Sequence, residues 1–248
     1  YWTGNTWAKL PTLRHPDYNE VTAPAQGPGL YALMSSLEIR LPFAGWNLMS
    51  YPVQATRAIT DAMASIAGYY RMAYGYDPGD TADPWKMYAP SLSGTATWVN
   101  DLHTLQFGQG YWISVTQPIT WELKGATTTL AQQSPTLVTP PATYYGRILA
   151  GPAFTPTVGM SVVASVAGKP CAQTTTRRAG AWLVYSLNVG YTEAVGMCGA
   201  PGQTVTFTVD GQAVATAPWQ NDYPQEVTLT TGAGFTYLYL PVTMRQGQ

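Results

Sequence analysis

Short runs of alternating apolar and polar residues recur along most of the chain, and this period of two predicts β-strands with one buried face. The runs are rich in aromatic and β-branched residues and are separated by glycine, proline and aspartate. Strands are expected at 45–51, 69–76, 85–88, 111–115 and 119–123, and further along at 145–149, 160–166, 171–175, 182–189, 205–209 and 227–229. We therefore expect a mainly β protein.

One segment between these runs follows a helical period instead. From Ala58 to Ala67 the apolar residues recur every three or four positions, and Gly68 then provides a helix end. The residues on the apolar face are Ile59, Ala62, Met63 and Ile66. One short α-helix is therefore expected near 58–67.

Turn-rich and low-complexity stretches divide the chain into five parts. The segment 126–142 is rich in Thr, Ser, Gln and Pro, which is typical of a stiff, extended linker. Beyond it, about seven short strands without a helix predict a β-sandwich, with Asp210-Gly211 as a type I′ hairpin turn. The expected parts are an incomplete β domain at 1–36 (the first unit), a β module with the helix at 37–125 (the second unit), the linker at 126–142, the β-sandwich at 143–232 (the third unit) and an extended tail at 233–248. The fold class is thus tandem β-sandwich-like modules.

The first unit has too few strands to close a sheet of its own. Gly4-Asn5 predicts a hairpin turn, and short strands are expected at 19–23 and 29–34. Three or four strands leave open edges, which proteins normally cover. We therefore expect the first unit to end a β domain that begins before Tyr1, and to pair with upstream strands or with another chain.

Composition and charge exclude several kinds of partner. Of 248 residues, 46% are hydrophobic and only 10% are charged, and the formal net charge is −1. The longest basic run is the pair Arg177-Arg178, which is expected in a solvated turn. Nucleic acid is therefore not an expected partner. No apolar run approaches the roughly 18 residues of a membrane-spanning helix, so no transmembrane span is expected.

Both cysteines, Cys171 and Cys198, lie in the third unit and share no metal-type spacing with a histidine. In an exported protein two such cysteines are expected to form one disulfide that closes a loop. Two buried free thiols are the alternative. We expect the disulfide.

A search for catalytic chemistry finds no candidate catalytic residue. A nucleophilic triad needs a base, but only His15 and His103 are available, and both are expected at the surface. The sequence has no Gly-x-Ser-x-Gly turn, no His-Glu-x-x-His zinc motif and no phosphate-binding loop. We therefore expect that the protein is not an enzyme.

Asp77, Asp80 and Asp83 form the densest charged cluster and share one loop rich in glycine and proline. Carboxylates are ligands that Ca²⁺ prefers, so a calcium site is one hypothesis and Ca²⁺ is the only candidate cofactor. The spacing is not that of an EF-hand, and Asp-Pro pairs also begin turns for local reasons. A plain turn is therefore the favoured interpretation.

The chain is rich in aromatic residues, with 17 Tyr and 9 Trp. Exposed rings stack on the faces of sugars, whereas rings that alternate along strands usually fill a core. The candidates for a carbohydrate-binding platform are Trp85, Tyr88, Trp98, Tyr111 and Trp112. We expect most of them to lie in the core.

The second and third units each resemble a known kind of module. The second resembles a module of large secreted bacterial proteins, through Gly45-Trp46-Asn47-Leu48, Ser50, Pro52, Tyr76-Asp77, Asp83-Pro84-Trp85-Lys86 and Gly108-Gln109-Gly110-Tyr111-Trp112-Ile113. The third is similar to carboxypeptidase-regulatory-like and transthyretin-like β-sandwiches, through Tyr145-Gly146, Gly168-Lys169-Pro170-Cys171, 185–189 and 201–207. These resemblances imply accessory modules without catalytic activity.

The two ends of the chain also resemble parts of exported proteins. The first unit is similar to the closing strands of surface-protein sandwich domains, through 2–7 and 28–33. The tail at 237–245 looks like a terminal signature of exported proteins from one bacterial phylum, which would place Gln248 near the true C-terminus. The resemblances together imply the C-terminal part of a modular, secreted bacterial surface protein.

The tail also suggests a mode of assembly. Phe235, Tyr237 and Tyr239 lie on one face of an extended segment, and Leu238 and Leu240 on the other. Because both faces are apolar, the segment should be buried on two sides. It is expected either to add a strand to a neighbouring module or subunit, or to end the third unit before a sorting tail.

These observations favour a structural or adhesive protein outside the cell, at the cell surface. It would serve as spacer modules or as the subunit of a filament or sheath. Its expected partners are other copies of itself, upstream domains of the same protein, or cell-surface polysaccharide. The alternative is a set of accessory carbohydrate-binding modules of a secreted hydrolase.

Overall fold

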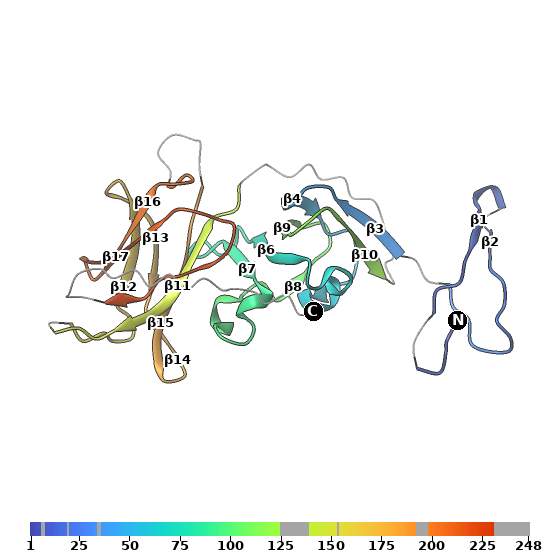
Figure 1. Cartoon of the computed structure of the whole chain (residues 1–248), viewed down its shortest axis with the longest axis horizontal. Coiled ribbons are helices and arrows are strands. Elements are labelled where there is room, and N and C mark those ends of the chain that lie inside the picture. The colour runs from blue at the N-terminus through green and yellow to red at the C-terminus, as the bar shows by residue number, and fades with distance from the viewer. Residues whose placement is uncertain are drawn as a thin grey trace, which may run out of the picture.

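The computed structural model describes residues 1–5, 8–18, 20–33, 36–124, 139–152, 154–191 and 198–230 (Figure 1). Within these residues the chain is mainly β, as the alternation predicts, with several antiparallel sheets, one short α-helix and a few 3-10 turns. The three units follow one another along the long axis of the molecule, and the first unit stands apart from the other two (Figure 1).

A four-stranded antiparallel sheet forms the centre of the second unit. Its strand order is β4 (Gly45–Ser50), β9 (Gly110–Val115), β6 (Tyr70–Tyr76) and β7 (Trp85–Tyr88). Two smaller antiparallel pairs lie beside it, β3 (Ser36–Leu41) with β10 (Ile119–Lys124) and β5 (Arg57–Ala58) with β8 (Thr104–Leu105).

The central sheet of the second unit is covered on both faces. One face packs against the helix and the β3–β10 pair, in a cluster that includes Ile66, Ile113 and Trp121. The other face packs against the segment 89–99 through Met72, Met87 and Leu92. That segment contains the 3-10 turns Pro90–Leu92 and Thr97–Val99.

The predicted helix is present but shorter than its apolar period suggests. Helix α1 spans Ile59–Ala62 and gives way to a 3-10 turn at Ala64–Ile66. No side chain caps α1, and an isolated helix of this length is not stable by itself. Burial of the predicted apolar face, Ile59, Ala62, Met63 and Ile66, holds it in place.

The third unit is a sandwich of two sheets around one apolar core. The first sheet contains β14 (Arg177–Ala179), β15 (Trp182–Val189) and β11 (Ala142–Leu149), and β18 (Gln225–Glu226) and β19 (Leu229–Thr230) pair with β11 in parallel. The second sheet has the order β13 (Lys169–Thr175), β12 (Ser161–Val166), β16 (Thr204–Val209) and β17 (Gln212–Pro218). Tyr144, Tyr185 and Phe207 lie at the centre of the core.

Two glycines in the third unit meet local geometric demands. Asp210 and Gly211 both have positive φ, 46° and 83°, which confirms the predicted hairpin turn between β16 and β17. Gly146 on β11 faces the backbone of Val227, where an added Cβ would collide with the carbonyl oxygen. The Tyr145 carbonyl accepts a hydrogen bond from Val227 N at 2.7 Å, so the backbones approach closely here.

The first unit has no core among its described residues. It contains the antiparallel pair β1 (Leu13–His15) and β2 (Glu20–Thr22), joined by a 3-10 turn at Pro16–Tyr18. None of its described residues is buried. The strand predicted at 29–34 is absent from the described residues 29–33, where Tyr31 instead bonds to the turn at Gly27.

Candidate functional site

The acidic loop 77–84 connects β6 to β7, and its carboxylates serve local turns. Asp77 Oδ1 accepts a hydrogen bond from Gly79 N at 2.9 Å. Asp80 Oδ1 accepts from Ala82 N at 3.2 Å and from Asp83 N at 3.1 Å. These are the Asx-type bonds that the plain turn interpretation predicts.

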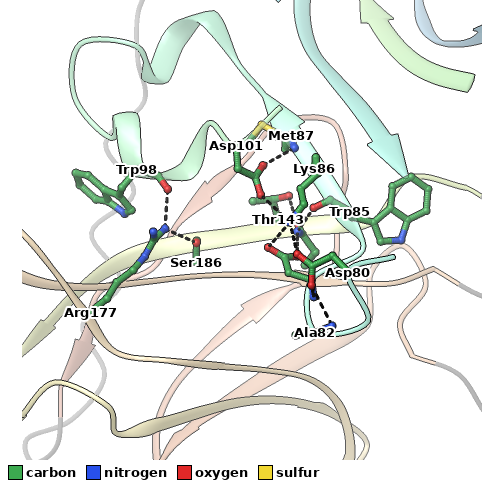
Figure 2. Close-up of polar contacts among 12 residues, drawn as sticks. Asp80, Ala82, Trp85, Lys86, Met87, Trp98, Asp101, Thr143, Arg177 and Ser186 are labelled. Carbon is green, nitrogen blue, oxygen red and sulfur yellow. Dashed lines mark hydrogen bonds and ion pairs between the residues drawn. The ribbon is translucent and has the colours of Figure 1, made fainter. Parts of the chain in front are cut away.

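Lys86 forms the centre of this charged group (Figure 2). Its Nζ lies 2.7 Å from Asp80 Oδ2, 3.7 Å from Asp101 Oδ2 and 4.0 Å from Asp83 Oδ2. The sequence groups Asp77 with Asp80 and Asp83. In the structure the third carboxylate beside Lys86 is instead that of Asp101, 15 positions further along the chain than Lys86. The Asp101 side chain also accepts a hydrogen bond from Met87 N at 2.7 Å.

The environment shifts the pKa of these groups in different directions. The hydrogen bond from Lys86 lowers the pKa of Asp80. Burial raises the pKa of Asp101, although Met87 N and Lys86 oppose it. Burial lowers the pKa of Lys86, but its hydrogen bond to Asp80 and the nearby carboxylates outweigh that effect, so the net shift is upward.

The carboxylates therefore gather around an ammonium group. In the part of the chain that the structure describes, no group of three or more His, Cys, Asp or Glu side chains is placed to hold a metal ion. A calcium site at Asp77, Asp80 and Asp83 stays a hypothesis that removal of metal would test.

A chain of buried and partly buried hydrogen bonds joins the second unit to the third. The Tyr74 hydroxyl lies 2.6 Å from Thr143 Oγ1, and Thr143 Oγ1 donates to Asn188 Oδ1. A threonine hydroxyl has one proton, so Tyr74 is the donor to Thr143. Asn188 Nδ2 in turn donates to Asp83 Oδ1 and to the Trp85 carbonyl, each at 3.0 Å. Burial raises the pKa of Tyr74, which keeps its hydroxyl protonated.

Apolar and cationic contacts extend the same contact surface. Tyr145 of the third unit completes the cluster that contains Met72, Tyr74 and Trp85 of the second. Arg177 Nη2 donates to the Trp98 carbonyl at 2.6 Å and to Ser186 Oγ at 3.2 Å (Figure 2). We call this surface the junction and define it by its members. They are Tyr74, Asp83, Trp85, Trp98, Thr143, Tyr145, Arg177, Ser186 and Asn188.

Arg177 shows where the sequence analysis was wrong. Arg177 and Arg178 lie on the edge strand β14, paired with β15, and not in a turn. This places the Arg177 guanidinium beside the second unit, where it bonds to the Trp98 carbonyl. Two adjacent arginines do not by themselves predict a strand, and it is the pairing with β15 that makes this segment a strand.

The five aromatic candidates for sugar binding lie at several depths. Trp85 and Tyr111 are buried, and Tyr111 accepts a hydrogen bond from Gln106 N at 2.9 Å. Tyr88, Trp98 and Trp112 are partly buried against the two clusters of the second unit. Their rings therefore help to fill the second unit and the junction.

The predicted disulfide is present in the third unit. Cys171 and Cys198 are bonded, with their Cα atoms 5.1 Å apart. Cys171 lies on the edge strand β13, and Cys198 precedes Gly199, whose positive φ lets its backbone pass against the Trp219 ring. The disulfide thus links the segment before β16 to β13, which is an edge strand of the same sheet.

Other predicted site residues lie away from the junction or outside the described residues. His15 ends β1, and His103 is an exposed residue just before β8. The assembly strand, Phe235, Tyr237, Leu238, Tyr239 and Leu240, lies outside the described residues, so docking of the tail stays a prediction.

The comparisons with known proteins leave the geometry as the guide to function. No protein family, curated protein or solved structure matches the chain. Among the described residues, no helix combines the length and apolar character that crossing a membrane requires.

Proposed function

We propose that the chain is a non-catalytic structural or adhesive protein of the cell surface, acting as spacer modules or as the subunit of a filament or sheath. One observation carries this proposal. The residues considered as candidates for calcium or sugar binding make contacts within the protein, and those at the junction join one β module to the next. Such use of polar groups suits an architectural role.

The disulfide supports the extracellular part of the proposal. Disulfides form and persist mainly in oxidising compartments, outside the cytoplasm. The low charge and high Tyr, Trp, Gly and Pro content fit a β-rich exported module. Neither property points to a particular partner.

Surface exposure is tested on intact cells that produce the protein. Brief treatment with a protease that cannot enter the cell should remove the chain, while a cytoplasmic marker protein stays intact. Electron microscopy of cells with and without the chain should then show a lost or altered surface layer or filament. A chain that is protected until the cells are lysed would contradict the proposal.

The filament version of this proposal makes the tail a docking element. Residues 235–244 would add a strand to a neighbouring subunit, and the first unit with its open edges is one acceptor. Deleting 235–248 should abolish assembly while the melting temperature of the third unit stays unchanged. If the deletion leaves assembly intact, or unfolds the third unit, the tail does not dock in this way.

The alternative function is accessory carbohydrate binding for a secreted hydrolase. One observation favours it, because Trp182 is 47% exposed and the Arg147 guanidinium lies 4.1 Å from its ring centre. Another weighs against it, because the two stacked ring pairs between residues 36 and 124, Tyr51–Trp121 and Tyr70–Tyr88, each contain a buried ring. Retention of the chain by insoluble or cell-wall polysaccharide, lost in Trp182→Ala, would support this alternative.

A further inference from the structure

The second and third units each have an apolar core of their own, and they are also packed against each other. The core of the third unit lies between its two sheets, and the main core of the second lies beneath α1. The cluster on the other face of the second unit's sheet also takes in Tyr145 from the third unit. The units therefore share buried surface in addition to the chain that connects them.

The chain between the units is long enough to allow many other arrangements. Strand β10 ends at Lys124, and residues 125–138 precede the described residue Thr139. A segment of this length spans about 45–50 Å when fully extended. It can hold the units near one another, but its length alone does not specify an angle between them.

The junction, in contrast, specifies an orientation. Thr143 and Asn188 are directly opposed on β11 and β15, and Tyr145 and Ser186 form the next pair on the same face. Thr143, Tyr145 and Asn188 contact the second unit from neighbouring positions on one sheet, so the pairing of β11 with β15 sets the spacing of these contacts. Ser186 accepts a hydrogen bond from Arg177, whose guanidinium also donates to the Trp98 carbonyl of the second unit. The Asn188 amide uses its oxygen within the third unit and its nitrogen toward the second. A rotation of one unit would break several of these contacts together.

We infer that the junction, and not the linker, fixes the arrangement of the second and third units, so that they form one rigid segment of the protein. Separation would expose the rings of Tyr74, Trp85 and Tyr145 to water, and it would break the hydrogen bonds of Asn188 to the second unit. The linker acts as a tether. This inference does not depend on whether the surface role is structural or carbohydrate-binding.

A distance measurement between spin labels tests the inference on the full chain. Gln117 of the second unit and Gln212 of the third are both exposed and lie outside the junction, so each is replaced by cysteine and labelled. The native cysteines stay in their disulfide and do not take up label. The unaltered junction should give one narrow distance distribution.

Two changes then separate the junction from the linker. Inserting six Gly and Ser residues within 125–138 should leave the distribution unchanged, because the junction still fixes the units. The double variant Tyr145→Ala with Asn188→Ala should broaden it at least twofold. The matched control, Tyr223→Ala with Gln173→Ala, removes a tyrosine and a side-chain amide outside the junction and should leave the distribution narrow.

Two results would overturn the inference. One is a distribution that shifts or broadens when the linker is lengthened, and the other is a distribution that stays narrow in a folded junction variant. If the double variant does not fold, Thr143→Val replaces it, because it keeps the side-chain shape and removes the hydroxyl between Tyr74 and Asn188. The linker insertion changes no residue of the junction, so it decides the question independently.

Discussion

Thr143 and Asn188 face each other across β11 and β15, and the Thr143 hydroxyl donates its proton to the Asn188 amide oxygen. This bond orients the amide so that its nitrogen points at the second unit, where Asp83 Oδ1 and the Trp85 carbonyl accept from it. Two paired polar residues of the third unit thus orient a side-chain amide toward the second unit. Its acceptor there, Asp83, lies 105 positions before Asn188 in the sequence.

The first prediction concerns this amide. Asn188→Ala removes the shared donor of the Trp85 carbonyl and of the half-exposed Asp83 carboxylate, and losing such a hydrogen bond costs about 0.5–1.5 kcal/mol of stability. Urea denaturation should show a loss of that size. Gln173→Ala removes an exposed amide that bonds to Ser161 within the third unit, and it should cost much less. Equal losses in the two variants would show that Asn188 has no special role.

The second prediction concerns alkaline pH. Burial, with a smaller contribution from Glu226, raises the pKa of Tyr145 to about 12, whereas an unfolded tyrosine titrates near 10.0. The folded state therefore holds this proton more tightly. Its contribution to stability is complete below pH 10 and is lost as the pH rises from 10 to about 12.

Urea denaturation between pH 8 and 11.5 measures this loss. Tyr145→Phe should lose less stability with rising pH than the unaltered protein, because the ionising group is gone. Tyr223→Phe, at a ring that is 51% exposed, should follow the unaltered profile. Identical pH profiles for Tyr145→Phe and the unaltered protein would contradict the assignment.

The third prediction concerns the disulfide. Reduction, or Cys171→Ala with Cys198→Ala, should destabilise the third unit by about 2–4 kcal/mol, because the bond closes a loop and restricts the unfolded chain. Peptide mapping without reductant should recover the two cysteines in one linked product. Dithiothreitol should not change the melting temperature of the double variant. Two thiols that react freely with an alkylating agent in the native protein would contradict this prediction.

The fourth prediction concerns metal removal. The Lys86 ammonium lies within 4.0 Å of carboxylate oxygens from Asp80, Asp83 and Asp101, and so supplies a positive charge at that point. EDTA should therefore leave the melting temperature unchanged, and added Ca²⁺ should not raise it. A rise of several degrees with Ca²⁺ that disappears in Asp80→Ala would establish the calcium site instead.

The fifth prediction concerns the first unit. Its described residues expose seven large apolar side chains and bury none. These are Trp2, Leu13, Tyr18, Val21, Leu30, Tyr31 and Leu33. Ordering each residue costs about 1–2 kcal/mol, and so little burial does not offset that cost. A peptide of residues 1–36 should show no dispersed NMR spectrum, and removing 1–35 should leave the melting temperature of the rest unchanged. A folded peptide would show that the unit is self-sufficient.

Much of the fold follows from patterns that are local in the sequence. The apolar face of α1, the Asp210-Gly211 turn and the strands β4, β6, β7 and β9 all agree with the expected positions. Strand β3 was not predicted although Leu37, Ile39 and Leu41 alternate, because that stretch was treated as the boundary of the second unit. Its partner is β10, and a pairing between strands so far apart in sequence leaves no local sign.

The junction was not predictable in the same way. Thr143, Ser186 and Asn188 occupy outward-facing positions of their strands, where alternation predicts contact with water. The second unit packs against that face, so Thr143 is buried and Ser186 and Asn188 are half-buried. Asp101 was missed for a related reason, since it lies far from the acidic loop in sequence and meets it only through Lys86.

The burial of residues changes along strand β11, and this change marks where contact with the second unit ends. From Ala142 to Gly146 every residue is buried, with Ala142 and Tyr144 toward the sandwich core and Thr143 and Tyr145 toward the second unit. From Arg147 onward, exposed and buried residues alternate again. Neither face of the first half of this strand is exposed, so substitutions on either face should be poorly tolerated. In natural variants of the protein, substitutions should spare five consecutive residues there and then accumulate only at every second position.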